Sequence, residues 1–319
     1  MIITVTLNTA IDKTLEVPNF RLGRRHRSVD QTTMPGGKGV NVARAIKRLG
    51  RPVIATGFAG GATGTRIVEA LTAESVLTDF IRIGEESRTN TAVLDPTTGV
   101  QTEINERGPR VTEREMELFR DKLLYLAQGA DICVFAGSLP RAVEPDVYGS
   151  LIKELRKLGV TTIVDTDGEP LRHAVRAEPD VVSPNVIEAE ELVGHEFNDD
   201  EDRMLAVAEI VEQGPREAIM TVPDGVFAKV ITEAGPQLYR VRVEQQEARA
   251  AVGSGDAFLA GYVACRYTGG TPEECLRFGV ACGAESTQHF GAGVIDPHNV
   301  ERLLGEVEAI PVSLSAEVG

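Results

Sequence analysis

Short apolar runs rich in β-branched residues alternate with segments of helical periodicity along most of this 319-residue chain. The strand-like runs are residues 2–8, 53–58, 131–137, 160–166, 181–185 and 217–222. Helical patterns fall between them, at 39–50, from about 64 to 74, near 144–158 and near 200–213. Repeated strand–helix units of this size predict a doubly wound α/β fold, with a mostly parallel sheet covered by helices on both faces.

Two segments interrupt this alternation. Residues 12–34 and 88–106 have the pattern of short strands joined by turns, and the second contains a turn signal at Thr98-Gly99. We expect the two segments to form a small β lid over a site, with an edge hairpin as the simpler alternative. The rest of the chain predicts a single domain over residues 1–310 and a polar C-terminal tail at 311–319.

Composition narrows the class of protein. A hydrophobic content of 42% is enough for a large core, and the four cysteines form no CxxC pair, so reduced thiols are expected. No stretch reaches the roughly 18 apolar residues that span a bilayer, and the N-terminus has no basic leader. We therefore expect a cytoplasmic protein with no membrane partner.

The formal net charge of −15 argues against nucleic acid as a partner, because such proteins need a cationic face. Small anionic ligands remain compatible with it, since screening makes a bound phosphate respond mainly to charges in its own pocket. The densest basic cluster is RLGRRHR, which ends at Arg27. A solvated loop and an anion site are equally consistent with that cluster alone.

The stretch VGSGDAFLAGY, residues 252–262, has the pattern of a loop followed by a helix. Gly253 and Gly255 allow successive backbone N–H groups to face one anion, to which the helix adds its positive end. Asp256 is compatible with a simple N-cap role. A carboxylate beside an anion site also fits a base that takes a proton from a hydroxyl attacking phosphorus.

A second glycine-rich helix start is PGGKGVNVARAIKRLG, residues 35–50. It does not match a Walker loop, because Lys38 is followed by Gly39, and the late glycines lack the spacing of a dinucleotide fingerprint. A helix-entry loop explains its glycines but not Lys38 and Asn41. Two such helix starts suit a site that holds two phosphorylated molecules.

Taken together, these motifs resemble the ribokinase-like, PfkB-type sugar kinases over nearly the whole chain. LNTAID, ESRTN, QTEINERGP, AGSLP, DTDG and SPNVIEAE fall in the family's order, and they look most like the branch of 1-phosphofructokinase and tagatose-6-phosphate kinase. The resemblance implies a ribokinase-like fold and a kinase that uses ATP and Mg²⁺. It also makes a homodimer through the lid plausible, because exposed strands can pair across a two-fold axis.

The resemblance also implies roles for particular residues. Asp256 would be the catalytic base, and the amides of Gly253, Ser254 and Gly255 would hold the transferring phosphoryl group. The sugar phosphate would be bound by Asp12, Arg27, Gly36, Gly37, Lys38, Asn41, Arg88, Arg107 and Ser138. The nucleotide would contact Asn185, Thr221, Gly225, Gly253 and Gly255. Asn185 and Glu188 would organise Mg²⁺, mainly through water, whereas Glu188 alone could be a solvated helix carboxylate.

Two segments depart from the family pattern on the nucleotide side. Ser183 replaces a frequent lysine, and the loop TVPDG at 221–225 contains Pro223, which has no N–H to donate, and the negative charge of Asp224. The expected activity is ATP-dependent phosphorylation of a ketohexose phosphate, with fructose 1-phosphate as the first choice. Tagatose 6-phosphate or fructose 6-phosphate as acceptor, or a non-catalytic sugar-phosphate binding protein, are the alternatives.

Overall fold

The computed structural model describes residues 1–244 and 252–313, and its main feature is a ten-stranded sheet. Seven neighbouring strands of this sheet run parallel. In spatial order they are β5 (Leu77–Ile83), β4 (Val53–Gly60), β1 (Ile2–Thr6), β8 (Ile132–Ala136), β9 (Thr161–Asp165), β10 (Val181–Val182) and β11 (Glu217–Val222). The mostly parallel α/β sheet predicted from the sequence is thereby confirmed.

Three antiparallel strands complete the sheet beyond β11, and the sequence analysis did not anticipate them as a unit. They are β12 (Gly225–Thr232), β13 (Gly235–Arg242) and β14 (Glu308–Val312). The strand β14 takes up residues 311 and 312, which were expected to begin the polar tail; residues 314–319 lie outside the described part. Pro311 is tolerated because β14 is the edge strand, where its missing N–H breaks no ladder.

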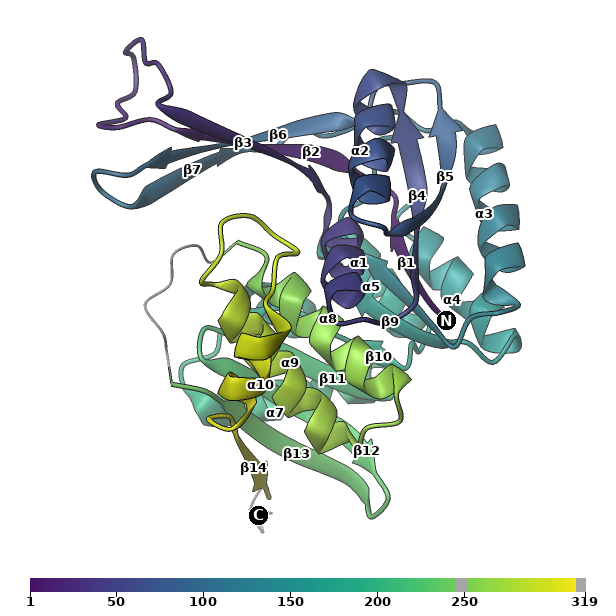
Figure 1. Cartoon of the computed structure of the whole chain (residues 1–319). Coiled ribbons are helices and arrows are strands. Elements are labelled where there is room, and N and C mark those ends of the chain that lie inside the picture. Colours follow the sequence, from purple (N-terminus) through teal and green to yellow (C-terminus); the bar gives the residue numbers. More distant parts are fainter. Residues whose placement is uncertain (245–251, 314–319) are drawn as a thin grey trace.

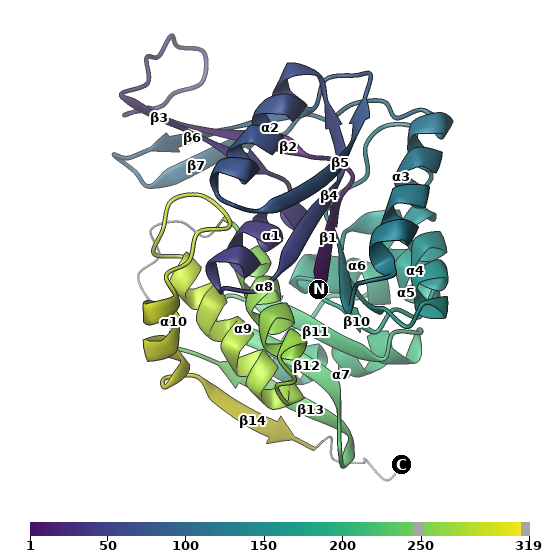
Figure 2. The ribbon, with the colours of Figure 1, turned by 45° about the vertical axis from the view of Figure 1, so that its right-hand side comes forward.

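Helices cover both faces of the sheet (Figures 1 and 2). One face carries α1 (Lys38–Arg48), α2 (Gly61–Ala73), α8 (Ser254–Tyr267), α9 (Pro272–Ser286) and α10 (Pro297–Leu304). The other carries α3 (Glu113–Ala127), α4 (Val147–Lys157), α5 (Gly168–Arg176), α6 (Val186–Val193) and α7 (Asp200–Glu212). No helix within the described ranges is long and apolar enough to cross a bilayer.

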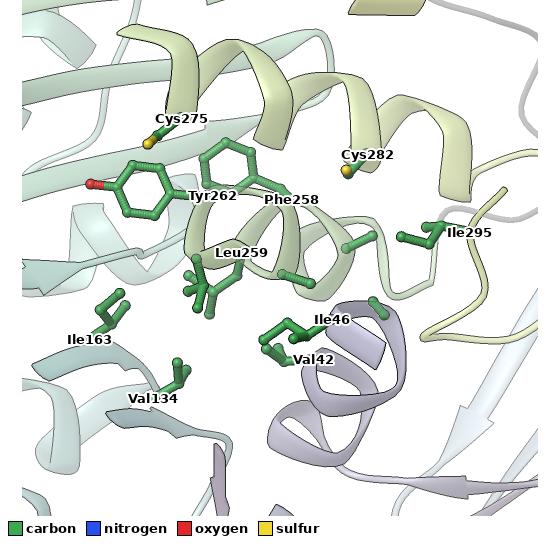
Figure 3. Packing of buried hydrophobic residues seen from close by; sticks show 14 of the residues in the cluster. Val42, Ile46, Val134, Ile163, Phe258, Leu259, Tyr262, Cys275, Cys282 and Ile295 are labelled. Carbon is green, nitrogen blue, oxygen red and sulfur yellow. The ribbon is translucent and has the colours of Figure 1, made fainter. Parts of the chain in front are cut away.

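Packing between α1 and α8 fixes the two glycine-rich helix starts relative to each other. Val42 and Ile46 of α1 belong to the same buried cluster as Phe258 and Leu259 of α8, as Figure 3 shows. Small residues let α9 approach closely, because a Cβ added at Gly261 would lie 2.6 Å from the Cys282 sulfur. The N-termini of α1 and α8 are therefore anchored by one core.

A separate four-stranded sheet projects from the body (Figure 1). Its strand order is β3 (Asp30–Gly36), β2 (Ala10–Glu16), β6 (Arg88–Asp95) and β7 (Val100–Ile104). These strands come from the two segments expected to form a lid, so neither is an edge hairpin of the main sheet. The turn at Thr98-Gly99 joins β6 to β7, where Gly99 N–H donates to the Asp95 carbonyl at 2.8 Å.

Candidate active site

The parallel strands reverse their order of connection between β1 and β8. The chain moves from β1 outward to β4 and β5 and then returns to β8 on the opposite side of β1. Ligands of open α/β sheets bind at such a switch point, outside the carboxyl ends of the strands. A cavity of about 820 Å³ lies there, between the strand ends, the N-termini of α1 and α8, and the inner face of the lid.

Asp256 lies in this cavity in the first turn of α8 and is 7% exposed. The N-cap of α8 is Gly253, and Asp256 instead accepts a hydrogen bond from Asn41 Nδ2 at its Oδ2, at 2.9 Å. Burial and the nearby carboxylate of Asp165 raise the pKa of Asp256 to about 7, although Lys38 and Asn41 act in the opposite direction. A carboxyl group with this pKa can accept a proton near neutral pH.

The turn before Asp256 has the geometry of an anion site. Gly253 has φ +85°, and a Cβ there would lie 2.4 Å from that of Ala292, so only glycine fits. Gly255 faces open space, with no atom within 4 Å of an added Cβ. The first N–H groups of a helix have no intrahelical partner, so α8 presents its amides and positive dipole end to the cavity.

Lys38 occupies the centre of the acidic part of the cavity. Its Nζ lies 2.7 Å from Asp165 Oδ1 and 3.4 Å from Glu188 Oε1. Burial disfavours the charged ammonium, but Asp165, Glu188 and Asp256 outweigh that effect and raise the pKa of Lys38. The sequence reading assigned Lys38 to the phosphate of the sugar; here its ammonium is held by carboxylates.

Asn185 and Glu188 form a capping box at the start of α6. Asn185 Oδ1 accepts from the Glu188 N–H, and Glu188 Oε2 accepts from the Asn185 N–H, both at 2.9 Å. Glu188 Oε1 is left to face Lys38 and the cavity. Burial raises the pKa of Glu188, which Lys38 partly counteracts.

The donor set here fits a hydrated Mg²⁺. Asp165 and Glu188 both bind Lys38, so their carboxylates lie close together, and Mg²⁺ prefers one or two carboxylates plus water. In the described ranges, no cluster of three or more metal-ligating side chains is present.

Asp12 projects from β2 of the lid. A Cβ on Gly36 would lie 2.0 Å from Asp12 Oδ2, so this carboxylate requires glycine at that position. Burial raises the pKa of Asp12, against the opposing effects of Asn90 and Arg88. Arg88 donates to the carbonyls of Asn8 at 3.3 Å and Glu106 at 3.0 Å, and burial lowers its pKa.

A second cavity, of about 650 Å³, adjoins the first one at the N-terminus of α8. Both cavities are lined by Asn185, Thr221, Ser254 and Gly255. The second is more apolar, with Ile187, Val222, Pro223, Phe258, Val280 and Ala284 in its walls, and Gly225 lines only this one. A cavity of this kind can hold a nucleobase while its polar junction holds phosphates.

The structure corrects the concern about Asp224. Its Oδ2 lies 2.6 Å from Arg240 Nη2, and the Arg240 guanidinium stacks over the Phe227 ring at 4.5 Å. Asp224 is absent from the walls of both cavities. Its charge is therefore paired on the strand side of the loop and is not directed at bound phosphates.

Most of the residues predicted from the sequence line the first cavity, and four do not: Gly36, Gly225, Arg27 and Arg107. Gly225 lines the second cavity, and Gly36 packs against the Asp12 carboxylate. Gly37, Ser138, Arg88, Asn41 and Lys38 line the first cavity. Arg27 lies exposed in the loop between β2 and β3, away from the cavity. Arg107 lines a neighbouring hollow with Arg141, and its carbonyl accepts from Asn8. Within one chain, these two arginines are not brought to the site.

Arg44 on α1 connects three parts of the site, and the sequence analysis did not single it out. This guanidinium is 3% exposed and makes two hydrogen bonds of 2.8 Å to Glu74. It also donates to the carbonyls of Ala292 at 2.7 Å and Pro35 at 3.5 Å. Because Ala292 packs on Gly253, Arg44 links the end of β3 to the turn before α8.

Asp165 is the other important residue that the sequence analysis left without a role. Its position at the carboxyl end of β9, within DTDG, could have identified it, because parallel strands direct such residues into the cleft. Asp167 lines the same cavity for the same reason. The partner of Asp165 is Lys38, which is 127 positions away in the sequence, and no spacing rule connects the two.

A family model described as pfkB family carbohydrate kinase matches residues 4–299. The chain belongs to the PfkB family. The resemblance drawn from the motifs is thereby confirmed, and the protein is a sugar-phosphate kinase, a phosphotransferase with an alcohol acceptor. ATP binding follows from membership of the family.

The relatives with curated names include both 1-phosphofructokinases and tagatose-6-phosphate kinases. The 1-phosphofructokinase of Borreliella burgdorferi is 32% identical over 283 residues, covering 89% of this chain and 90% of the relative. The tagatose-6-phosphate kinase of Staphylococcus epidermidis is 31% identical over 316 residues, covering 98% and 100%. Both names agree with a hexose-phosphate kinase.

Solved structures agree with the fold. The phosphofructokinase-2 of Escherichia coli in complex with substrates and products matches this PfkB-family chain with a TM-score of 0.89 and 29% identity, over 95% of this chain and 98% of the other. The ribokinase of Arabidopsis thaliana has a TM-score of 0.76 at 21% identity, over 95% and 98%. The second match confirms the ribokinase-like fold.

Proposed function

We propose that this kinase transfers a phosphoryl group from ATP to a hydroxyl of a phosphorylated ketohexose, with fructose 1-phosphate as the first choice of acceptor. The observation that carries the proposal is Asp256, a buried carboxyl group of pKa about 7 at the N-terminus of α8. The acceptor class is supported by relatives named 1-phosphofructokinase and tagatose-6-phosphate kinase.

In this proposal, the acceptor hydroxyl lies against Asp256, which Asn41 holds in place at 2.9 Å. Asp256 accepts the hydroxyl proton while the oxygen attacks the terminal phosphorus, and ADP leaves. The free amides at Ser254 and Gly255 stabilise the negative charge that spreads over the transferring group. Gly37 and Asp12 hold the sugar at the other end, and Arg88 binds the phosphate that it already carries.

Mg²⁺ would be organised by Asp165 and Glu188, together with Asn185, and it would neutralise charge on the donor phosphates. The carboxylates that would face the ion are at present balanced by Lys38. This gives Lys38 a role in keeping the acidic side of the cavity from repelling the nucleotide.

A panel of acceptors tests the proposal. Purified protein with ATP and Mg²⁺ is incubated with fructose 1-phosphate, fructose 6-phosphate, tagatose 6-phosphate and the unphosphorylated sugars, and ADP release is followed in a coupled assay. We expect the highest kcat/KM with fructose 1-phosphate. Tagatose 6-phosphate is the second candidate, because the tagatose-6-phosphate kinase of Staphylococcus epidermidis is matched over its full length. Turnover on free sugars alone would contradict the proposal, and ligand binding without any ADP would favour a non-catalytic binding protein.

We also propose that the lid mediates a homodimer. The outer strand β7 is exposed along its whole length, and Val100 and Ile104 are 61% and 63% exposed. Leu22 and Val29, in and beside the β2–β3 loop, are 89% and 68% exposed. Apolar groups exposed on an open edge strand such as β7 favour pairing with a second copy, and Leu22 and Val29 add exposed apolar surface elsewhere on the lid. Sedimentation should give a dimer, and Ile104→Glu should shift it toward monomer; a monomeric parent protein would refute the proposal.

A further inference from the structure

Asn90 stands directly opposite Asp12 in the lid. The parallel pairing of β2 with β6 places the two residues in register, and both line the cavity. Asn90 Nδ2 donates to Asp12 Oδ1 at 2.8 Å. The pair therefore projects from two neighbouring strands as one polar unit on the face of the lid that covers the cavity.

The orientation of the Asn90 amide follows from its partner. An ionised carboxylate only accepts hydrogen bonds, so the NH₂ group must face Asp12 and the carbonyl oxygen must point away from it. Asn90 Oδ1 is buried and has no hydrogen-bond partner among the described residues. This acceptor therefore needs a donor from within the cavity, which is either water or a ligand hydroxyl.

The same arrangement recurs at the catalytic end. Asn41 Nδ2 donates to Asp256, and Asn41 Oδ1 is likewise buried without a partner in the described ranges. Two asparagine–aspartate pairs, one from the lid and one joining α1 to α8, thus present acceptor oxygens to one cavity. A ligand rich in hydroxyl donors satisfies both pairs, whereas an apolar or acceptor-only ligand does not.

We propose that Asn90 is a specificity-determining residue whose Oδ1 accepts a hydrogen bond from a sugar hydroxyl adjacent to the one bound by Asp12. The inference rests on the proposed function, because it concerns the same acceptor. Asp12 Oδ2 and Asn90 Oδ1 belong to hydrogen-bonded side chains, so they match two neighbouring hydroxyls of one sugar. The pair would select a vicinal diol and reject sugar phosphates that lack one of the two hydroxyls.

Asn90→Ala tests the inference, with Asn198→Ala as its matched control. Asn198 is also an asparagine whose Nδ2 donates to an aspartate, Asp202 Oδ2, at 3.1 Å, but it is exposed just before α7 and lines neither cavity. The acceptor that the parent protein uses is compared with deoxy analogues that each lack one hydroxyl. We expect Asn90→Ala to lower kcat/KM about fivefold for the full sugar phosphate, since one hydrogen bond contributes roughly 1 kcal/mol.

The decisive readout is discrimination between analogues. The parent protein and Asn198→Ala should reject two deoxy analogues, and Asn90→Ala should lose its preference against one of them only. A second readout is the pH dependence of sugar-phosphate binding. The Asn90 N–H favours the ionised form of Asp12, so the pKa of Asp12 should rise further in Asn90→Ala. When the pH is lowered, sugar-phosphate binding by this variant should therefore begin to weaken at a higher pH than binding by the parent.

The outcomes separate this inference from the proposed function. If Asn90→Ala rejects every deoxy analogue as strongly as the parent does, the assignment of Asn90 is wrong even though turnover is intact. If the parent turns over no sugar phosphate, the proposed function fails. The Kd values of the same analogues for the parent and for Asn90→Ala then decide the role of Asn90. Equal Kd values for parent and Asn90→Ala would then refute it.

Discussion

Replacing Asp256 with Asn should strongly slow turnover and at the same time stabilise the folded protein at neutral pH. An unfolded aspartate titrates near pH 3.9, whereas in the folded chain burial raises the pKa of Asp256 to about 7. Below about pH 4 the group is protonated in both states and contributes nothing. As the pH rises toward 7, only the unfolded chain releases its proton, so folding becomes less favourable.

The magnitude follows from the difference between the two pKa values. About three pKa units at 1.36 kcal/mol each give about 4 kcal/mol of destabilisation at most, fully developed above about pH 7. Asn stays neutral at every pH, and its carbonyl can still accept from Asn41. Asp256→Asn should therefore gain up to about 4 kcal/mol over the parent at about pH 8 and almost nothing at about pH 4.

Urea unfolding across this pH range measures the stability, and coupled ADP release measures turnover. The variant should lose a factor of about 10² to 10⁴ in kcat, as expected for removal of a positioned base. In the parent, kcat/KM should fall about tenfold per pH unit below about pH 7, because the base is then protonated. A parent rate that does not change between about pH 5 and 7, or a variant that is no more stable at about pH 8, would refute this reasoning.

Asp95→Asn is the control of opposite sign. Burial opposes ionisation at Asp95 as well, but N–H donors of Thr97, Asn19 and Phe20 outweigh it and lower the pKa of this carboxyl. Stability from Asp95 is present above the unfolded pKa and is lost as the pH falls through the lower folded value. Its replacement should destabilise the protein at neutral pH and leave the pH dependence of kcat/KM unchanged.

Three further predictions concern the same cavity. Gly253→Ala should lower the free energy of unfolding by about 1–3 kcal/mol, because Gly253 has a positive φ and an added Cβ would meet Ala292. Gly255→Ala should unfold in urea like the parent but lose turnover, because its Cβ enters the open cavity. Lys38→Met should raise the pKa of Asp256 and move the acid limb of kcat/KM above pH 7; an altered KM without that shift would favour a phosphate-binding role instead. Glu188→Gln keeps the capping box, so its thermal unfolding should change little. The Mg²⁺ concentration that gives half the maximal rate should rise, and an unchanged Mg²⁺ dependence would argue against the metal role of Glu188.

Local sequence patterns predicted most of the fold. The parallel strands were predictable because strands that are buried on both faces appear as continuous apolar runs, and β11 coincides with the expected residues 217–222. The antiparallel extension was missed because β14 is short, contains Pro311 and pairs with a strand far away in the sequence. Hydrophobic periodicity identifies a strand but not its neighbour.

The parts of the site that depend on glycine-rich helix starts were predictable from the sequence. The contacts between polar side chains that are far apart in the sequence were not. The turn before Asp256 and the helix start at Lys38 are visible in the sequence, because tight turns require glycine. The contact of Lys38 with Asp165 and that of Asn90 with Asp12 depend on strand order and register, which a single sequence does not specify. Asn185 and Glu188 had the spacing of a capping box, so that part of their role was available from the sequence alone.

The contacts of Arg44 have a mechanical consequence. Its guanidinium donates to the carbonyls of Pro35, at the root of the lid, and of Ala292, which lies 248 positions after Arg44 and packs against Gly253 in the turn before α8. A swing of β3 must therefore displace that turn or break a buried charged hydrogen bond. The position of the lid and that of the turn before α8 are thus coupled through the contacts of one buried side chain.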